Sequence, residues 1–179
     1  MYDLEKIVIV GNFNFSDKEG LNTIVMKTDG LKVESVLCLC DIGTTSGDST
    51  DVKNDILSEL YSDQYDDDLK IKVKEVINGE DAVIRIANFI NKYWNENTLL
   101  YYYDPTDKVF NKLTKELEKK NGHIYLIDYY DLFNDGHNIE KDIYEIMKEQ
   151  GLKLENLIKD SQVSLAYFLS ALVEKILSK

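Results

Sequence analysis

The sequence has very little proline and cysteine, and it has no long apolar run. One Pro, nine Gly and two Cys among 179 residues exclude a collagen-like, a proline-rich or a disulfide-stabilised chain. No apolar run approaches the roughly 18 residues that a membrane-spanning helix needs. The first residues combine an acidic flank with a short apolar run, which is not the pattern of a signal peptide. We therefore expect a cytoplasmic protein with no membrane partner.

Basic residues are also scarce relative to acidic ones. Lys and Arg total 21 against 33 Asp and Glu, so the formal net charge is -12. A chain this acidic repels phosphate backbones as a whole, and nucleic-acid binding therefore requires a local basic patch. The hydrophobic content of 44% is sufficient for a core, and the length fits a single domain over 1–179.

The apolar pattern predicts strands in the first half of the chain. Three β-branched runs indicate an antiparallel meander, in which Asp29 and Gly30 mark a hairpin turn. Its strands are expected at 7–15, 21–28 and 31–40. Residues 41–68 are polar and acidic, and we expect a loop or insertion with a short helix at 52–61. The alternation of Lys with aliphatic residues at 70–76 indicates an edge strand.

Helical periodicity dominates the second half. Helices and strands alternate there, which favours β/α units that extend the sheet. Helices are expected at 81–94, 107–120, 139–150 and 161–177, and strands at 98–103 and 123–128. Gly151 is typical of the residue after a helix end, and the last helix has the strongest amphipathic pattern. The fold class is therefore α/β, with helices packed on a mixed sheet.

Three short segments carry polar side chains next to these predicted elements. Asn12 and Asn14 stand at the end of the first strand, Asp107 opens a helix after a strand, and Glu155 and Asp160 precede the last helix. In this order and at these distances the segments resemble the motifs of the proofreading-type DEDD 3′–5′ exonucleases. That resemblance implies the RNase H-like fold, in which a three-stranded antiparallel meander is followed by β/α units.

The same resemblance implies a degenerate site. The family has Asp and Glu where this chain has Asn12 and Asn14, and a histidine where it has Glu155. Two-metal cleavage relies on carboxylates that hold two divalent ions, and a neutral amide does not compensate their charge. Asp107 and Asp160 are the remaining candidate metal ligands. We expect no cofactor, and Mg²⁺ or Mn²⁺ only if the site is active.

Three interpretations of function stay open. The first is an inactive exonuclease-like domain that binds a single-stranded nucleic acid or a protein partner. The second is an active metal-dependent 3′–5′ exonuclease that uses other acids, such as Asp41, Asp104 or Asp128. The third is an acidic module that binds only proteins. Asp107 and Asp160 have an ordinary alternative role as acids at helix starts.

Lysine spacing predicts two basic faces. A track of lysines at helical spacing, on the helix that Asp107 opens, consists of Lys108, Lys112, Lys115 and Lys119. This track is a candidate contact for phosphates, and its alternative role is that of a solvated helix face. A second row, on the expected edge strand, consists of Lys70, Lys72 and Lys74, and lysine there also prevents edge-to-edge aggregation.

The two cysteines, Cys38 and Cys40, are separated by one residue on a predicted strand, so their side chains share one face. Neither His123 nor His137 has metal-ligand spacing to them. We interpret both cysteines as small, buried apolar side chains.

Overall fold

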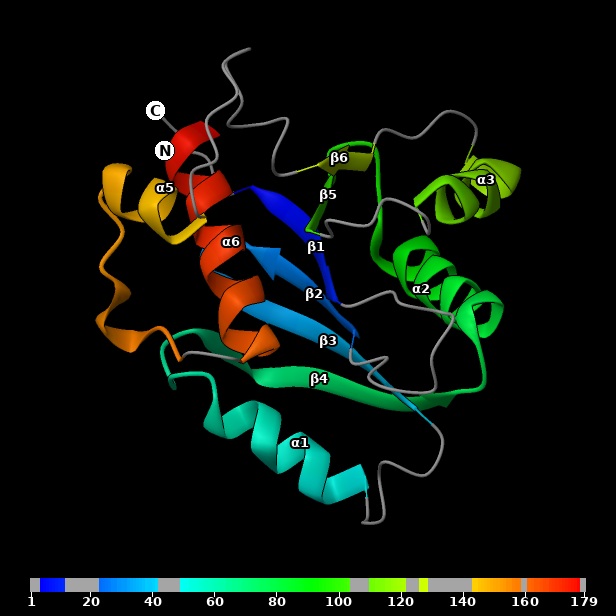
Figure 1. The fold of residues 1–179 in the computed structure, drawn as a ribbon, viewed down its shortest axis with the longest axis horizontal. Helices are drawn as coiled ribbons and strands as arrows, with labels where there is room; N and C mark the ends of the chain where they lie inside the picture. The colour runs from blue at the N-terminus through cyan, green and yellow to red at the C-terminus, as the bar shows by residue number, and fades with distance from the viewer. Residues whose placement is uncertain are drawn as a thin grey trace.

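A six-stranded sheet forms the centre of the described part of the protein (Figure 1). The computed structural model describes residues 4–11, 23–41, 49–103, 110–121, 126–128, 143–158 and 161–177. The strands are β1 (Glu5–Gly11), β2 (Thr23–Asp29), β3 (Lys32–Asp41), β4 (Tyr65–Val76), β5 (Leu99–Tyr103) and β6 (Leu126–Asp128). The helices are α1 (Ser49–Ser58), α2 (Gly79–Tyr93), α3 (Phe110–Asn121), α5 (Ile143–Glu149), the short η1 (Leu154–Asn156) and α6 (Gln162–Leu177).

The sheet is mixed, and one strand runs against the others. Its strand order is β4-β3-β2-β1-β5-β6. β2 is antiparallel to β1 and β3, whereas the β3–β4, β1–β5 and β5–β6 pairs are parallel. The predicted α/β class, the meander and the edge strand are therefore confirmed. All strands except β2 end on one side of the sheet, which we call the carboxyl edge, and the opposite side is the amino edge.

The β2–β3 hairpin turns at a glycine, as the sequence predicts. Asp29 pairs with Lys32, so Gly30 and Leu31 form the two-residue link. Gly30 has a φ of 58°, a left-handed conformation that glycine adopts without steric cost. Gly151, with a φ of 84°, follows the end of α5 in the same region of backbone space.

β4 begins earlier than the sequence predicts. Tyr65 already pairs with Val33, and the next pair in the register is Ser35 with Lys70. Residues 66–69 therefore lie opposite a single residue of β3, which makes this part of the strand irregular. The acidic residues at the end of the expected loop are accommodated in this irregular part.

The predicted loop at 41–68 is therefore too long. β3 extends to Asp41, β4 begins at Tyr65, and α1 starts at Ser49 rather than at residue 52. Asp has a low intrinsic preference for strands, but pairing with β3 outweighs that preference here.

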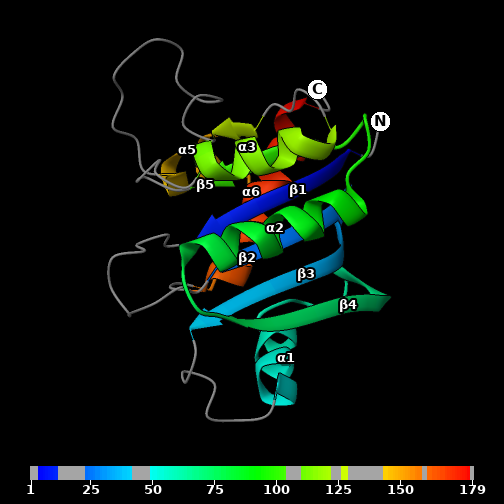
Figure 2. The same cartoon turned by 90° about the vertical axis from the view of Figure 1, so that its right-hand side faces the viewer.

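The sheet separates two apolar cores, one on each face. Ile7 and Ile9 of β1 belong to the core under α2 and α3, whereas Val8 and Val10 belong to the core under α1, α5 and α6. This alternation follows from the two-residue repeat of a strand. Figure 2 shows α2 and α3 on the near side of the sheet and α6 on the far side.

α6 is buried over most of its surface, so the prediction that it is the most amphipathic helix is wrong. The sheet covers one side of α6, and side chains of α5 and of the segment around η1 pack against the same core. Even polar positions of α6 are buried, among them Ser164 and Ser170. Among the described residues, no helix is long and apolar enough to cross a membrane.

A buried ion pair joins the first strand to the last helix. Lys6 is 0% exposed, and its Nζ lies 2.5 Å from Glu174 Oε2 and 2.9 Å from Gly30 O. The Leu4 N–H also donates to the Glu174 carboxylate, at 3.2 Å. These contacts fix the C-terminal part of α6 against the amino edge of β1.

Candidate functional site

Most residues of the degenerate site that the exonuclease resemblance implies lie outside the described residues. These are Asn12, Asn14, Asp107 and Asp160, together with Lys108 of the predicted track. The described strand ends show where two of the motif segments start. Val10 of β1 pairs with Tyr103 of β5, and both strands end at the carboxyl edge. The chain therefore enters the first and second motifs from neighbouring strands, and their convergence stays a prediction.

The described residues around the third motif lie elsewhere. Glu155 is an exposed residue of η1. Ser161 caps α6 by accepting a hydrogen bond from Ser164 N at 3.0 Å, and its hydroxyl donates to Glu59 at 2.8 Å. Farther along α6, the Tyr167 hydroxyl donates to Leu31 O, in the hairpin at the amino edge.

Among the described residues, the hydrogen bonds of α6 with Lys6, Thr28 and Leu31 lie toward the amino edge, opposite to the ends of β1 and β5. A role for Asp160 in one site with Asn12, Asn14 and Asp107 stays a prediction. Within the described ranges, no group of three or more His, Cys, Asp or Glu residues is placed to hold a metal ion.

The cysteines are part of the core, as predicted. Cys38 and Cys40 are both buried, and their Sγ atoms are 3.7 Å apart. The hydrogen bond with Cys40, together with burial, raises the pKa of the Cys38 thiol above its ordinary value. A thiol with a raised pKa is a poor nucleophile, so the pair acts as apolar packing.

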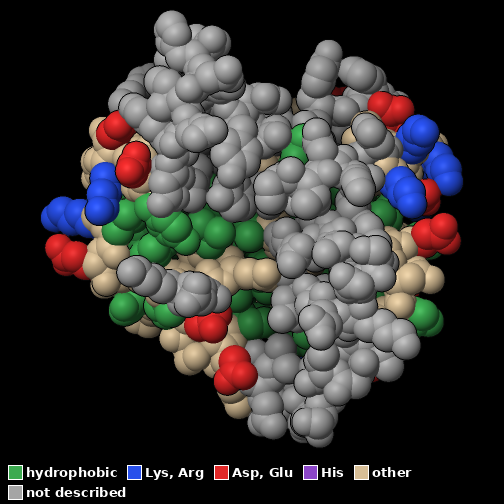
Figure 3. Space-filling view, in the orientation of Figure 1, with side chains coloured by type: hydrophobic (Ala, Val, Ile, Leu, Met, Phe, Trp, Pro, Cys, Tyr) green, Lys and Arg blue, Asp and Glu red, His purple; other side chains and the backbone are tan. Residues whose placement is uncertain are grey.

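The lysine track on α3 is solvent-exposed. Lys112, Lys115 and Lys119 are exposed, and Leu113 and Leu117 are buried on the opposite face, as predicted. Lys119 pairs with Glu116 at 2.9 Å, one turn earlier. Blue side chains gather over α3 at the upper right of Figure 3. Carboxylates of the same helix accompany these lysines, and Lys112 and Glu116 line a small cavity beside α2.

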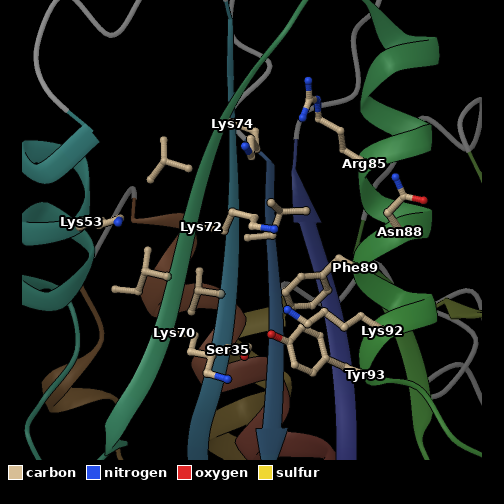
Figure 4. A pocket seen from close by; sticks show the side chains of 14 residues that line it. Ser35, Lys53, Lys70, Lys72, Lys74, Arg85, Asn88, Phe89, Lys92 and Tyr93 are labelled. Carbon is tan, nitrogen blue, oxygen red and sulfur yellow. The ribbon is translucent and has the colours of Figure 1, made fainter.

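A different basic surface lies between α2 and the edge strand β4 (Figure 4). It is a cavity of about 540 Å³, open to solvent, which we call the α2–β4 groove. Its lining residues from β3, α1, β4 and α2 are Ser35, Val36, Leu37, Lys53, Lys70, Ile71, Lys72, Val73, Lys74, Arg85, Asn88, Phe89, Lys92 and Tyr93. None of these residues is acidic.

The two-residue repeat of β4 builds one wall of the groove. Lys70 pairs with Ser35 and Lys72 with Leu37, so these lysines stand beside β3 on the face that α2 partly covers. Ile71 and Val73 pack instead against the core on the opposite face. Lysine on this face leaves the space beside α2 open, because a solvated ammonium group does not join an apolar core.

One face of α2 builds the other wall. Five residues of α2 recur at helical spacing and therefore share one side of the helix: Arg85, Asn88, Phe89, Lys92 and Tyr93. The rings of Phe89 and Tyr93 are 4.8 Å apart and tilted. Phe89 is buried, whereas Tyr93 is partly exposed at the groove. Figure 4 shows both rings directed toward the sheet.

The positive charge of the groove is divided unequally between its walls. Arg85 on α2 pairs with Asp81 at 3.2 Å, and Lys92 lies 5.2 Å from the centre of the Tyr93 ring. On the other side, the structure shows no ion pair within the described ranges for Lys53, Lys70, Lys72 or Lys74. Lys53 comes from α1, on the far side of β4 (Figure 4).

The field of these cations acts on Tyr93. Burial raises the pKa of Tyr93, but hydrogen bonds with Ser35 and Lys92 and the charges of Lys92 and Lys70 lower it more. The net pKa is therefore below the ordinary value of 10.0. The Ser35 hydroxyl is the largest cause that lowers this pKa, and the neighbouring cations Lys92 and Lys70 add to its effect.

This shift gives a direct test of the local potential. The difference in ultraviolet absorbance between wild type and Tyr93→Phe, followed against pH, should reveal a phenol that ionises below the usual pKa of tyrosine. Replacing Lys70 or Lys92 by Gln should raise that pKa, because each substitution removes a nearby positive charge. A Tyr93 phenol with an unshifted pKa, insensitive to both substitutions, would contradict the positive potential.

The sequence indicates the β4 lysines but not the groove. Their alternation predicts a basic face on an edge strand, which also protects the edge from aggregation, and no sequence pattern assigns a role to the polar face of α2. The signal was present in two patterns, alternating lysines at 70–74 and helical spacing at 85–93. Their meeting depends on the parallel pairing of β4 with β3, a long-range contact that neither local pattern contains.

Comparison with known proteins gives no match: no protein-family model, no curated protein and no solved structure matches the chain.

Proposed function

We propose that this chain is an RNase H-like domain of the exonuclease type that binds a nucleic-acid strand in the α2–β4 groove without cleaving it. The order β3-β2-β1-β5-β6, with β2 alone reversed, is consistent with RNase H-like topology, and β4 adds a strand beside the meander. The first and second motif segments also follow neighbouring strand ends, at Gly11 and Tyr103.

One observation carries the binding part of the proposal. Four lysines line one groove and have no ion-pair partner among the described residues: Lys53, Lys70, Lys72 and Lys74. The chain that carries them has a net charge of -12. In so acidic a protein, cations without carboxylate partners are favourable where an anionic ligand supplies the missing charge. Backbone phosphates are such ligands, and lysine contacts to phosphate dominate non-specific nucleic-acid binding. Repulsion by the rest of the surface directs the strand to this groove.

The binding test is a titration of a fluorescent single-stranded oligonucleotide of about 12 nucleotides, followed by anisotropy at several salt concentrations. Three or four lysine–phosphate contacts predict a slope of log affinity against log salt of about −2 to −3. Affinity should then fall by about 30-fold between about 50 and 200 mM salt. No binding at the lower concentration, or binding that ignores salt, would contradict the proposal.

A second ligand, an acidic peptide, tests the interpretation that the partner is a protein and not a nucleic acid. Polyglutamate of similar length carries negative charge but no phosphate, sugar or base. Binding of polyglutamate as tight as that of the oligonucleotide would favour an acidic protein as the partner and would overturn the nucleic-acid proposal.

Absence of cleavage is a separate prediction. Asn12 and Asn14 replace two metal-binding carboxylates of the family, and Glu155 replaces its histidine. A 3′-labelled oligonucleotide incubated with the protein and Mg²⁺ or Mn²⁺ should therefore keep its length. Time-dependent shortening that Asp107→Ala abolishes would show an active nuclease instead.

A further inference from the structure

The two walls of the α2–β4 groove offer different chemistry to a bound strand. On the β4 wall, Lys70, Lys72 and Lys74 have no ion-pair partner among the described residues. On the α2 wall, Arg85 is engaged by Asp81 and Lys92 lies near the ring of Tyr93. The exposed groups of the α2 wall are thus an amide, an aromatic ring and two cations that already have partners.

We infer that the groove binds single strands with their phosphates along β4 and their bases against α2, where Tyr93 and Asn88 contact the bases. This inference rests on the proposed function, and it adds a preferred form of nucleic acid and an orientation to it. It gives Tyr93 and Asn88, which carry no positive charge, a role in contact with bases.

The β4 wall is suited to a row of phosphates. Lysines two residues apart on a strand project to the same side at a spacing of about 6.6 Å. This spacing is comparable with the distance between successive phosphates of an extended single strand. Lys70, Lys72 and Lys74 can therefore contact consecutive phosphates without bending the ligand.

The α2 wall is suited to bases. Phe89 is buried behind Tyr93, with ring centres 4.8 Å apart, and supports the Tyr93 ring. Figure 4 shows the Tyr93 ring directed toward the sheet. Stacking on a fixed aromatic ring tolerates every base, because each base has a π-face. Asn88, one turn before Lys92, is exposed and carries both a donor and an acceptor for base edges.

A duplex uses only one of these walls. Its bases stay stacked and paired, so Tyr93 would have no free base face to contact. A single strand can place phosphates on one wall and splayed bases on the other, which is the arrangement of stacking platforms in single-strand binding proteins. The geometry therefore predicts a preference for single strands over duplex of the same sequence.

The test compares three ligands of equal length: oligothymidylate, the same backbone with abasic sites, and a duplex. Wild type should bind oligothymidylate about 10-fold more tightly than the abasic strand, because stacking contributes substantially for each base. The duplex should bind more weakly than oligothymidylate at the same salt. Tyr93→Ala should reduce oligothymidylate binding toward the abasic level, whereas Tyr93→Phe, which keeps the ring, should retain wild-type affinity.

A second readout distinguishes the walls. Lys72→Gln should reduce the salt slope by about 0.7 for all single-stranded ligands, whereas Tyr93→Ala should lower affinity without changing that slope. Equal affinity for oligothymidylate and the abasic strand, with no effect of Tyr93→Ala, would overturn this inference and leave the proposed function standing. Failure of every ligand to bind would overturn the proposed function and this inference with it. Melting curves confirm that each variant is folded.

Discussion

Reversing the charge of Lys70, Lys72 and Lys74 together should weaken single-strand binding by about 100- to 1000-fold at about 50 mM salt. The three substitutions to Glu remove the cations that lack partners among the described residues, and they add repulsion in the same groove. Glutamate also protects a sheet edge from aggregation, so the variant should stay monodisperse. Fluorescence anisotropy with the labelled oligonucleotide measures the change.

The matched control reverses the same number of charges on α3. Three lysines of α3 are exposed, and the last of them already pairs with Glu116: Lys112, Lys115 and Lys119. Their substitution to Glu changes the net charge equally, so it should weaken binding by no more than about threefold through long-range repulsion. Equal losses in both variants would mean that net charge alone controls binding. A large loss confined to the α3 variant would make the lysine track the interface.

Removing Glu174 should cause a large loss of stability. Glu174→Ala removes the carboxylate that pairs with Lys6, a side chain that is 0% exposed. Breaking a buried pair in this way costs about 3–5 kcal/mol in the free energy of unfolding. The Leu4 N–H loses its acceptor in the same variant. Urea denaturation followed by circular dichroism gives the value.

Two comparisons show whether burial causes that loss. Glu116→Ala breaks an exposed pair with Lys119 and should cost less than about 1 kcal/mol. Combining Lys6→Met with Glu174→Leu removes both charges and should recover most of the stability. If Glu174→Ala were no more destabilising than Glu116→Ala, the pair would not be a structural link between β1 and α6.

The sequence predicts the local part of this fold well and the long-range part less well. The three strands of the meander and the turn at Gly30 follow from β-branched runs and an Asp-Gly pair, which are short-range signals. The start of β4 at Tyr65 does not, because pairing with β3 extends the strand into acidic residues of low strand preference. α6 was expected to be amphipathic, but contacts on several sides bury even Ser164 and Ser170.

The α2–β4 groove also depends on a long-range contact that local sequence patterns do not predict. Alternation at 70–74 fixes the side on which the lysines project, and helical spacing at 85–93 fixes the polar face of α2. Nothing local indicates that these two faces meet. Their meeting follows from the strand order, in which β4 lies outside β3 and leaves its lysines beside α2. The exonuclease resemblance points to residues such as Asn12 and Asp107 instead, which are outside the described residues.

The most direct measurement of the central claim is a map of the bound strand on the protein. Nuclear magnetic resonance spectra of the isotope-labelled protein, titrated with a short oligothymidylate at low salt, report which backbone amides change. We expect the largest changes in residues 70–74 of β4 and 85–93 of α2, with smaller changes near Ser35. Changes confined to α3, or spread evenly over the surface, would contradict binding in the α2–β4 groove.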